Sequence, residues 1–174
     1  MDSEDEEPDF PSVSLTDLQI PIQNVVLPER AAEFIRDGRQ RFKSVNCFDF
    51  VPSNYENAWS VLDQIARGSF CEWGSGLGIT VGLAEILGYE ACGIELDSGL
   101  AELSREFLRD HGLKAMIKTG SYYDDCPVAD VYYVYCWPGQ TENVERRFVE
   151  IAPPSGRLLI CYGQDDLRCM VQQR

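Results

Sequence analysis

A glycine-rich turn between two apolar runs constrains the fold of this chain more than any other feature of its sequence. The first run, residues 69–73, leads into three glycines at alternate positions: Gly74, Gly76 and Gly78. Apolar residues then recur at helical spacing as far as Gly88, and a second apolar run, residues 91–94, ends at Glu95. Glycine is required where a backbone turns tightly and lies against a ligand. The order of strand, turn, helix, strand and acid predicts an α/β domain that binds a ligand at the turn.

The spacing of the glycines separates two classes of nucleotide ligand. The dinucleotide fingerprint, G-x-G-x-x-G, would place its third glycine at position 79, where Ile79 stands. Here the spacing is G-x-G-x-G, and Glu72 precedes it. A helix that opens near Leu77 can turn free N–H groups toward the polar or anionic end of a ligand. Glu95, at the tip of the second strand, can accept two hydrogen bonds from a ribose diol.

Residues 72–78 read E-W-G-S-G-L-G. This pattern of an acid followed by G-x-G-x-G resembles motif I of the class I S-adenosylmethionine (SAM)-dependent methyltransferases. An acid begins that motif and a second acid ends the next strand, which matches Glu95; the resemblance covers roughly residues 50–163. It implies SAM as the cofactor and nine cofactor-binding residues: Glu72, Gly74, Ser75, Gly76, Gly78, Glu95, Leu96, Ser121 and Tyr122. Glu72 would bind the ammonium group and Glu95 the ribose. The alternative is a tight strand-to-helix turn in some other α/β protein.

Two positions depart from the pattern of that family. Many relatives carry an acid at the tip of the third strand to receive the adenine amino group, and Ser121 replaces it here. Amine-methylating relatives often carry an N/D-P-P-Y/F motif after the fourth strand. This chain has its candidate catalytic residues there: Cys136, Trp137 and Pro138. The position agrees with a methyl-acceptor site, whereas the residue types leave the acceptor open. The alternative for Trp137 is packing on the following helix.

Charge and composition limit the classes of partner. The formal net charge of −14 at pH 7 would repel phosphate backbones over most of the surface, which argues against nucleic acid. No apolar run approaches the ~18 residues that cross a membrane, and the acidic N-terminus lacks the features of a secretory signal. Seven cysteines without a C-x-x-C pair indicate reduced thiols, and one histidine makes a zinc site unexpected. We therefore expect a cytoplasmic protein without metal that acts on a small molecule or a protein.

The 174 residues fit one core preceded by a tail and an arm. Residues 1–14 are acidic and lack apolar periodicity, which predicts a disordered tail. Residues 15–49 are predicted as an N-terminal arm and a helix, the helix running from Pro28 to about Phe42. Residues 50–174 are predicted as the SAM-binding methyltransferase domain.

A second helix is predicted to start at Ser53, because Ser53 and Glu56 have the S-x-x-E spacing of a capping box. Apolar residues recur from Trp59 to Ala66, and Gly68 supplies the stop. The preceding segment, residues 50–53, reads F-V-P-S and resembles a segment that lies near the cofactor in some small bacterial methyltransferases. The alternative for this segment is a plain helix cap.

Strands alternate with helices along the rest of the chain. Further elements are expected as strands at residues 113–118, 131–136 and 157–162, and as helices at residues 98–111 and 141–152. Asp97 is expected to cap the helix at 98–111, and Leu103 to face the sheet. This order predicts an α/β, Rossmann-like three-layer sandwich with a mostly parallel central sheet.

One departure from the family concerns the end of the sheet. The family fold has two further strands after the fifth, and nothing between Gly163 and Arg174 can supply both. The fold is therefore expected to lack the usual last two strands. The fifth strand would become an exposed edge, covered by the N-terminal arm or by another subunit in a homo-oligomer.

Several other side chains have two interpretations. Tyr132, Tyr133 and Tyr135 could form an aromatic cage for a methylated cation, but core positions in a buried strand are favoured. Asp124 and Asp125 are expected in a solvated turn rather than on a substrate. His111 ends a helix, where the helix dipole favours a cation, and nothing places it near the site.

Three functions follow from these observations. The first is a SAM-dependent methyltransferase acting on a small molecule or a protein amine. The second is a non-catalytic SAM-binding or assembly protein with a methyltransferase fold. The third, an NAD-type nucleotide-binding enzyme, is disfavoured by Ile79.

Overall fold

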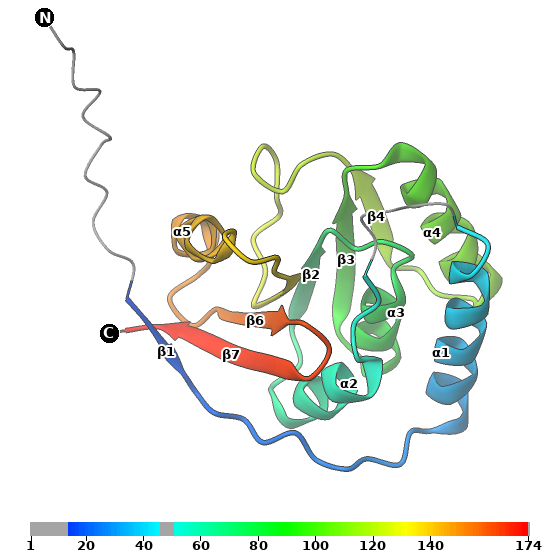
Figure 1. Ribbon diagram of the computed structural model, residues 1–174, viewed down its shortest axis with the longest axis horizontal. Coiled ribbons are helices and arrows are strands. Elements are labelled where there is room, and N and C mark those ends of the chain that lie inside the picture. The colour runs from blue at the N-terminus through cyan, green and yellow to red at the C-terminus, as the bar shows by residue number, and fades with distance from the viewer. Residues whose placement is uncertain (1–13, 46–50, 174) are drawn as a thin grey trace, which may run out of the picture.

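The structure is a computed structural model that describes residues 14–45 and 51–173. The tail predicted at residues 1–14 lies outside the described residues except for its last residue, and Phe50 also lies outside them. One seven-stranded sheet carries helices on both faces (Figure 1), which confirms the predicted α/β sandwich. None of the described helices combines the length and apolar character that crossing a bilayer requires.

The sheet has the strand order β1-β7-β6-β5-β2-β3-β4. Its strands are β1 (Leu15–Asp17), β2 (Ser69–Trp73), β3 (Glu90–Glu95), β4 (Met116–Thr119), β5 (Val131–Tyr135), β6 (Arg157–Tyr162) and β7 (Asp166–Gln172). The five strands from β2 to β6 are parallel, whereas β7 is antiparallel to β6 and β1 is antiparallel to β7. Strand β2 lies between β3 and β5, so the chain reverses its direction of travel across the sheet at the carboxyl end of β2, where α/β sheets open a crevice.

The predicted absence of the last two strands holds only in part, because the described residues after β6 supply one further strand, β7, and not both. A turn at Gly163, whose φ is +70°, folds the chain back into β7. The outermost strand, β1, comes from the other end of the sequence, and the Leu18 N–H donates to the Cys169 carbonyl at 2.9 Å where the pairing ends. Strand β6 is therefore interior, and the exposed edge predicted for it does not exist. Asp166 and Arg168 pair with each other on β7. Charged residues such as these make the segment resemble a polar tail in the sequence.

The helices are α1 (Glu29–Phe42), α2 (Tyr55–Gln64), α3 (Ile79–Ile86), α4 (Ser98–Asp110) and α5 (Thr141–Ile151). The capping box predicted for Ser53 is wrong, because the Asn54 side chain caps α2 and accepts from the Asn57 N–H at 3.1 Å. Glu56 instead pairs with Arg39 of α1 at 2.8 Å. Asp97 caps α4 as predicted, accepting from the Leu100 N–H at 2.7 Å.

Two apolar clusters lie on opposite faces of the sheet. Helices α1 to α4 bury their inner residues in the larger cluster, whereas α5 alone covers the other face (Figure 1). Leu103 of α4 is 44% exposed, so the prediction that it faces the sheet is wrong. Buried Ser104 takes the inward position beside it. Gly38 lets α1 approach closely, because a Cβ there would lie 2.6 Å from the Cδ1 of Ile79.

Candidate functional site

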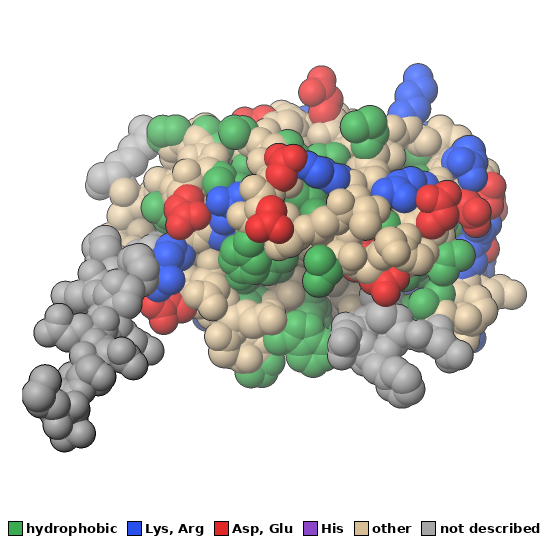
Figure 2. Space-filling model, turned by 90° about the horizontal axis from the view of Figure 1, so that it is seen from above, with side chains coloured by type: hydrophobic (Ala, Val, Ile, Leu, Met, Phe, Trp, Pro, Cys, Tyr) green, Lys and Arg blue, Asp and Glu red, His purple; other side chains and the backbone are tan. Residues whose placement is uncertain are grey.

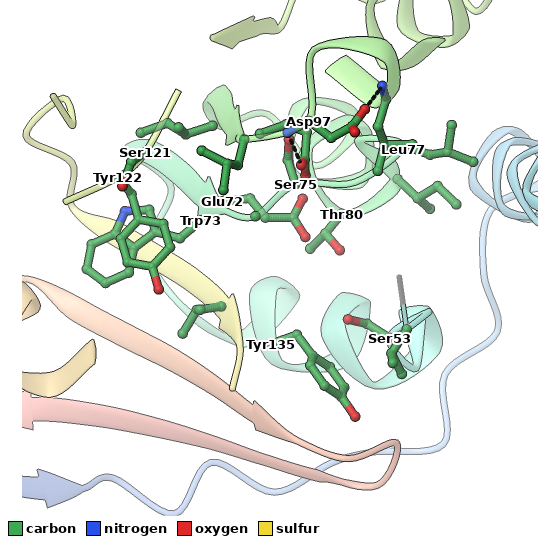
Figure 3. Close-up of a pocket in the computed structure, with 18 of the residues that line it drawn as sticks. Ser53, Glu72, Trp73, Ser75, Leu77, Thr80, Asp97, Ser121, Tyr122 and Tyr135 are labelled. Atoms are coloured by element: carbon green, nitrogen blue, oxygen red, sulfur yellow. Dashed lines mark hydrogen bonds between the residues drawn. The ribbon is translucent and has the colours of Figure 1, made fainter. Parts of the chain in front are cut away.

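A cavity of about 660 Å³ opens at the carboxyl ends of the central parallel strands. It is lined by the glycine turn, the ends of β3 and β5, the loop after β4, and the segment before α2 (Figure 3). Figure 2 looks onto this end of the molecule, where hydrophobic side chains gather between acidic and basic ones. A volume of this size fits an organic ligand of the size of a nucleoside cofactor.

The three glycines of the turn all adopt left-handed backbone, with φ values of +69°, +55° and +73°. Only glycine takes this conformation without strain. A Cβ on Gly74 would meet nothing within 4 Å, since this residue borders open space. A Cβ on Gly78 would collide with the Ser104 hydroxyl of α4. The turn therefore needs glycine for its path and, at Gly78, for its packing.

Glu95 holds the turn and borders the cavity. Its Oε2 accepts from the Gly76 N–H at 2.8 Å and its Oε1 accepts from the Asp97 N–H at 2.9 Å. The side chain is buried, yet it lines the cavity rather than pointing into bulk water. An ionised carboxylate can accept about four hydrogen bonds, so each oxygen retains capacity for a ligand hydroxyl.

Glu72 lies deeper in the same cavity. Its Oε2 accepts from the Val81 N–H at 3.2 Å, and Figure 3 shows its carboxylate close to the Thr80 hydroxyl. Burial raises the pKa of Glu72 well above its ordinary value of 4.5, and the hydrogen bond from Thr80 only partly opposes this rise. Burial of this kind favours the uncharged form of the acid until a cationic partner arrives.

Unsatisfied polar atoms collect beside the turn. The backbone N–H groups of Leu77, Ile79 and Thr80 have no partner among the described residues, and all three residues line the cavity. The buried Ser75 hydroxyl likewise has no partner there. Free N–H groups at the start of α3 suit a carboxylate or another anionic group.

Aromatic rings form the opposite part of the cavity (Figure 3). The rings of Trp73 and Tyr122 stack, with their centroids 4.8 Å apart and their planes at 5°. The ring centroid of Tyr123 lies 4.4 Å from that of Tyr122. Across the cavity, Tyr135 and Trp137 meet edge to face at 5.5 Å.

The structure brings together most of the cofactor-binding residues that the sequence predicts. All but two line the cavity: Glu72, Gly74, Ser75, Glu95, Leu96, Ser121 and Tyr122. The remaining two, Gly76 and Gly78, shape the turn without lining the cavity.

Of the three candidate catalytic residues, only one lines the cavity. Cys136 is 2% exposed, and its sulfur lies 3.6 Å from the Thr141 hydroxyl in the core rather than at the cavity. Pro138 is exposed and does not line the cavity either. Trp137 is 42% exposed and does line it. Alternating side-chain direction at the end of β5 explains why neighbours point to different places.

Sequence reasoning missed several lining residues. Val51 and Ser53 are not among them: both line the cavity, which agrees with the resemblance of residues 50–53 to a segment near the cofactor. Tyr55 and Gln140 also line it, and no sequence motif marked either one. Asp97 was interpreted only as a cap, although its position two residues after Glu95 was a signal for the site.

The structure also shows where the tyrosines of β5, Asp125 and His111 lie. Tyr132 and Tyr133 are buried core residues, as favoured, whereas Tyr135 reaches the cavity. Exposed Asp125 pairs with Lys118 on the surface. His111 bonds to Asp37 at 2.8 Å and does not line the cavity.

Comparisons with known proteins identify the fold. No protein-family model matches the sequence, and a search of curated proteins finds no match. Among solved structures, an RNA methyltransferase from Salinibacter ruber in complex with S-adenosyl-L-homocysteine superposes with a TM-score of 0.60 at 17% identity. That match covers 70% of this chain and 93% of the other.

Two further structures agree. A putative O-methyltransferase from Klebsiella pneumoniae gives a TM-score of 0.56 at 13% identity, covering 78% of this chain and 66% of that one. The ribosomal protein L11 methylase from Lactobacillus delbrueckii subsp. bulgaricus gives 0.52 at 14% identity, covering 60% of this chain and 57% of that one. The chain thus spans less than two thirds of the length of these two. It has the Rossmann-like fold of the class I methyltransferases.

Proposed function

We propose that this chain, which has the fold of the class I methyltransferases, binds SAM and transfers its methyl group to an acceptor. The observation that carries the proposal is the set of polar groups around one cavity. Residues at the start of α3 whose N–H groups have no partner in the described part of the chain line the same cavity as Glu72 and Glu95. SAM presents a carboxylate, an ammonium group and a ribose diol, so this donor and acceptor set matches its chemistry.

Different residues of the cavity would bind different groups of the cofactor. The N–H groups of Leu77, Ile79 and Thr80 would hold its carboxylate, and Glu72 its ammonium group. Glu95 would accept from the ribose hydroxyls, while exposed Leu96 would lie against the adenine. When bound, SAM supplies a methyl group that is already activated by a positive sulfur. The protein then needs chiefly to align the acceptor and to exclude water.

Calorimetric titration with SAM, S-adenosyl-L-homocysteine and NAD tests the proposal. We expect one site for the two sulfur compounds and none for NAD, because Ile79 is buried where the dinucleotide turn needs glycine. Binding of NAD, or no binding of either sulfur compound, would refute it.

A matched pair of variants tests the position of the site. Glu95→Ala should weaken binding of S-adenosyl-L-homocysteine by about 1–3 kcal/mol, the scale of hydrogen bonds to a charged group. Glu90→Ala changes an exposed glutamate at the far end of the same strand and should leave the affinity unchanged. Equal affinities of all three proteins would contradict the assignment.

A second candidate is a SAM-binding protein without catalytic activity. The burial of Cys136, at the position where amine-methylating relatives carry a polar residue, favours it. Turnover assays against mixed amines, phenols and proteins separate the two. Binding of SAM without transfer to any acceptor would support this candidate.

A further inference from the structure

One part of the cavity is not used by the groups that the proposed function assigns to SAM, although one of its residues, Tyr122, is among the cofactor-binding residues that the sequence predicts. It is lined by five aromatic residues, which we call the aromatic half: Trp73, Tyr122, Tyr123, Tyr135 and Trp137. We propose that the aromatic half binds a flat aromatic molecule that is neutral or cationic. This inference rests on the proposed function, which assigns the other half of the cavity to SAM. Anionic molecules of the same shape are excluded.

The shape of the aromatic half favours a flat molecule. The stacked pair of Trp73 and Tyr122 forms one side, and the edge-to-face pair of Tyr135 and Trp137 forms another (Figure 3 labels the first three). Flat rings gain most from such surroundings, because they can stack on a face or meet an edge. A cation over these rings is also attracted by their electron-rich faces.

Exposed rings mark the mouth of the cavity. Tyr123 is 45% exposed and Trp137 is 42% exposed, although large aromatic side chains are usually well buried. Neither ring is needed by the core clusters, which do not include them. Apolar groups left at the rim of a cavity are typical of a surface that a ligand covers.

The charges around the cavity decide between cations and anions. Its acidic lining residues are Glu95, Asp97 and the buried Glu72, whose uncharged form is favoured, and no Lys, Arg or His lines it among the residues the structure describes. Arg147 of α5 comes near, but its Nε donates to the backbone carbonyl of Tyr122 at 3.0 Å from outside the cavity.

An anionic acceptor would therefore lose its water without gaining a cationic partner, and carboxylates would lie nearby. Desolvating an unpaired charge is costly. A neutral or cationic molecule avoids this cost, and Gln140 and Ser53 offer it uncharged polar groups. The formal net charge of −14 acts in the same direction at long range, since it attracts cations to the protein.

Three indoles that differ mainly in charge test the proposal: cationic tryptamine, neutral 3-methylindole and anionic indole-3-propionate. Each is titrated into the full chain saturated with S-adenosyl-L-homocysteine, with calorimetry as the readout, so no turnover is required. We expect tryptamine to bind at least about tenfold more tightly than indole-3-propionate, with 3-methylindole between them. Butylamine, which has the charge without the ring, should bind more weakly than tryptamine.

The outcomes separate this inference from the proposed function. If S-adenosyl-L-homocysteine does not bind, the proposed function fails. If it binds but indole-3-propionate binds as tightly as tryptamine, or if no indole binds, the assignment of the aromatic half is overturned.

A matched pair of variants locates the site. Trp137→Ala should lower the affinity for tryptamine about tenfold and leave that for S-adenosyl-L-homocysteine unchanged. Met116→Ala removes an apolar side chain, 75% exposed, from edge strand β4 outside the cavity and should change neither affinity. An unchanged tryptamine affinity in Trp137→Ala would overturn the proposed location.

Discussion

At the residue scale, the two glutamates of the site differ in what surrounds their carboxylates. Glu95 accepts from two backbone N–H groups, which organise the turn before any ligand arrives. Glu72 accepts from one, the Val81 N–H at the start of α3, and from the Thr80 hydroxyl. The same residue type therefore serves as a positioned acceptor at one point and as a buried, readily protonated acid at the other.

The first prediction concerns the pH dependence of stability. Glu72 ionises near 4.5 in the unfolded chain but at higher pH in the folded protein, because burial raises its folded pKa. Between these values the folded state binds more protons, so the free energy of unfolding falls as the pH rises through that window. Glu72→Gln has no proton to lose and should lack this part of the fall.

Urea unfolding at several values from about pH 5 to about pH 8 measures the effect. Glu90→Gln, which changes an exposed glutamate, should follow the wild type. Parallel curves for the wild type and Glu72→Gln would show that the folded pKa of Glu72 is not raised.

The second prediction concerns the packing of Gly78. Gly78→Ala should cost about 1–2 kcal/mol for left-handed backbone and about a further 1–3 kcal/mol for collision with the Ser104 hydroxyl. Gly112→Ala is the control, since Gly112 has a φ of +67° but open space around it, and only the first cost applies.

Chemical denaturation compares the two variants. Ser104→Ala removes a buried hydroxyl that has no partner in the described part of the chain, so it should relieve most of the second cost in a double variant. Equal losses in Gly78→Ala and Gly112→Ala would contradict the collision.

At the element scale, the N-terminal arm acts as part of the sheet and of the helical layer. Strand β1 closes the sheet beside β7, and the arm then runs to α1 (Figure 1). On the way, the Gln23 N–H donates to the Ser60 hydroxyl at 2.8 Å, and the Gln64 side chain donates to the Pro21 carbonyl at 2.8 Å. Both contacts fasten the arm to α2, whose N-terminal end borders the cavity.

The third prediction tests the contact between α1 and α3. A Cβ at Gly82 of α3 would collide with the Phe34 ring of α1, and it would lie 3.0 Å from the Cδ1 of Leu113. Alanine is favoured over glycine in a helix by about 1 kcal/mol, yet we expect Gly82→Ala to destabilise the protein by about 1–3 kcal/mol through overpacking.

A control in another helix isolates the contact. At Gly99 of α4 a Cβ would meet only the Asp97 carboxylate at 3.3 Å, so Gly99→Ala should stabilise the protein or leave it unchanged. Phe34→Leu should relieve part of the loss in a double variant with Gly82→Ala. A stabilised Gly82→Ala protein would show that the two helices can separate without cost.

At the scale of the whole molecule, helices α1 to α4 pack on one face of the sheet and α5 packs on the other, among residues 14–45 and 51–173. The cavity lies at the end of the sheet, between the glycine turn and the loops after β4 and β5. Its two halves differ in chemistry, one with carboxylates and free N–H groups and one with aromatic rings. On the proposed function and the further inference, a chain of this size would hold a cofactor site and an acceptor site within one continuous space.

The fourth prediction concerns salt. A net charge of −14 makes the folded protein repel itself, and this repulsion exceeds what exposed ion pairs contribute, since each is worth about 0–1 kcal/mol. Raising sodium chloride from about 20 mM to about 200 mM should therefore raise the melting temperature by a few degrees. Potassium chloride should act equally, and a lowered melting temperature would mean that the ion pairs dominate.

The sequence by itself determined the glycine turn, the strand and helix that flank it, and most residues of the half of the cavity that the proposed function assigns to SAM. These features depend on neighbours within about twenty residues, and backbone preferences and apolar spacing act over that range. The cap of α4 and the extent of α1 were predictable for the same reason. The residues that cause these features lie close together in the sequence.

Only the tertiary structure decided how distant segments meet. Strand β1 has three residues and no signal of its own, so its place beside β7 follows from pairing over 150 positions of sequence. Cys136 and Trp137 are neighbours, yet packing against α5 buries the first and leaves the second at the cavity. Such outcomes follow from which surfaces the folded chain brings into contact, because burial is a property of the whole packed molecule.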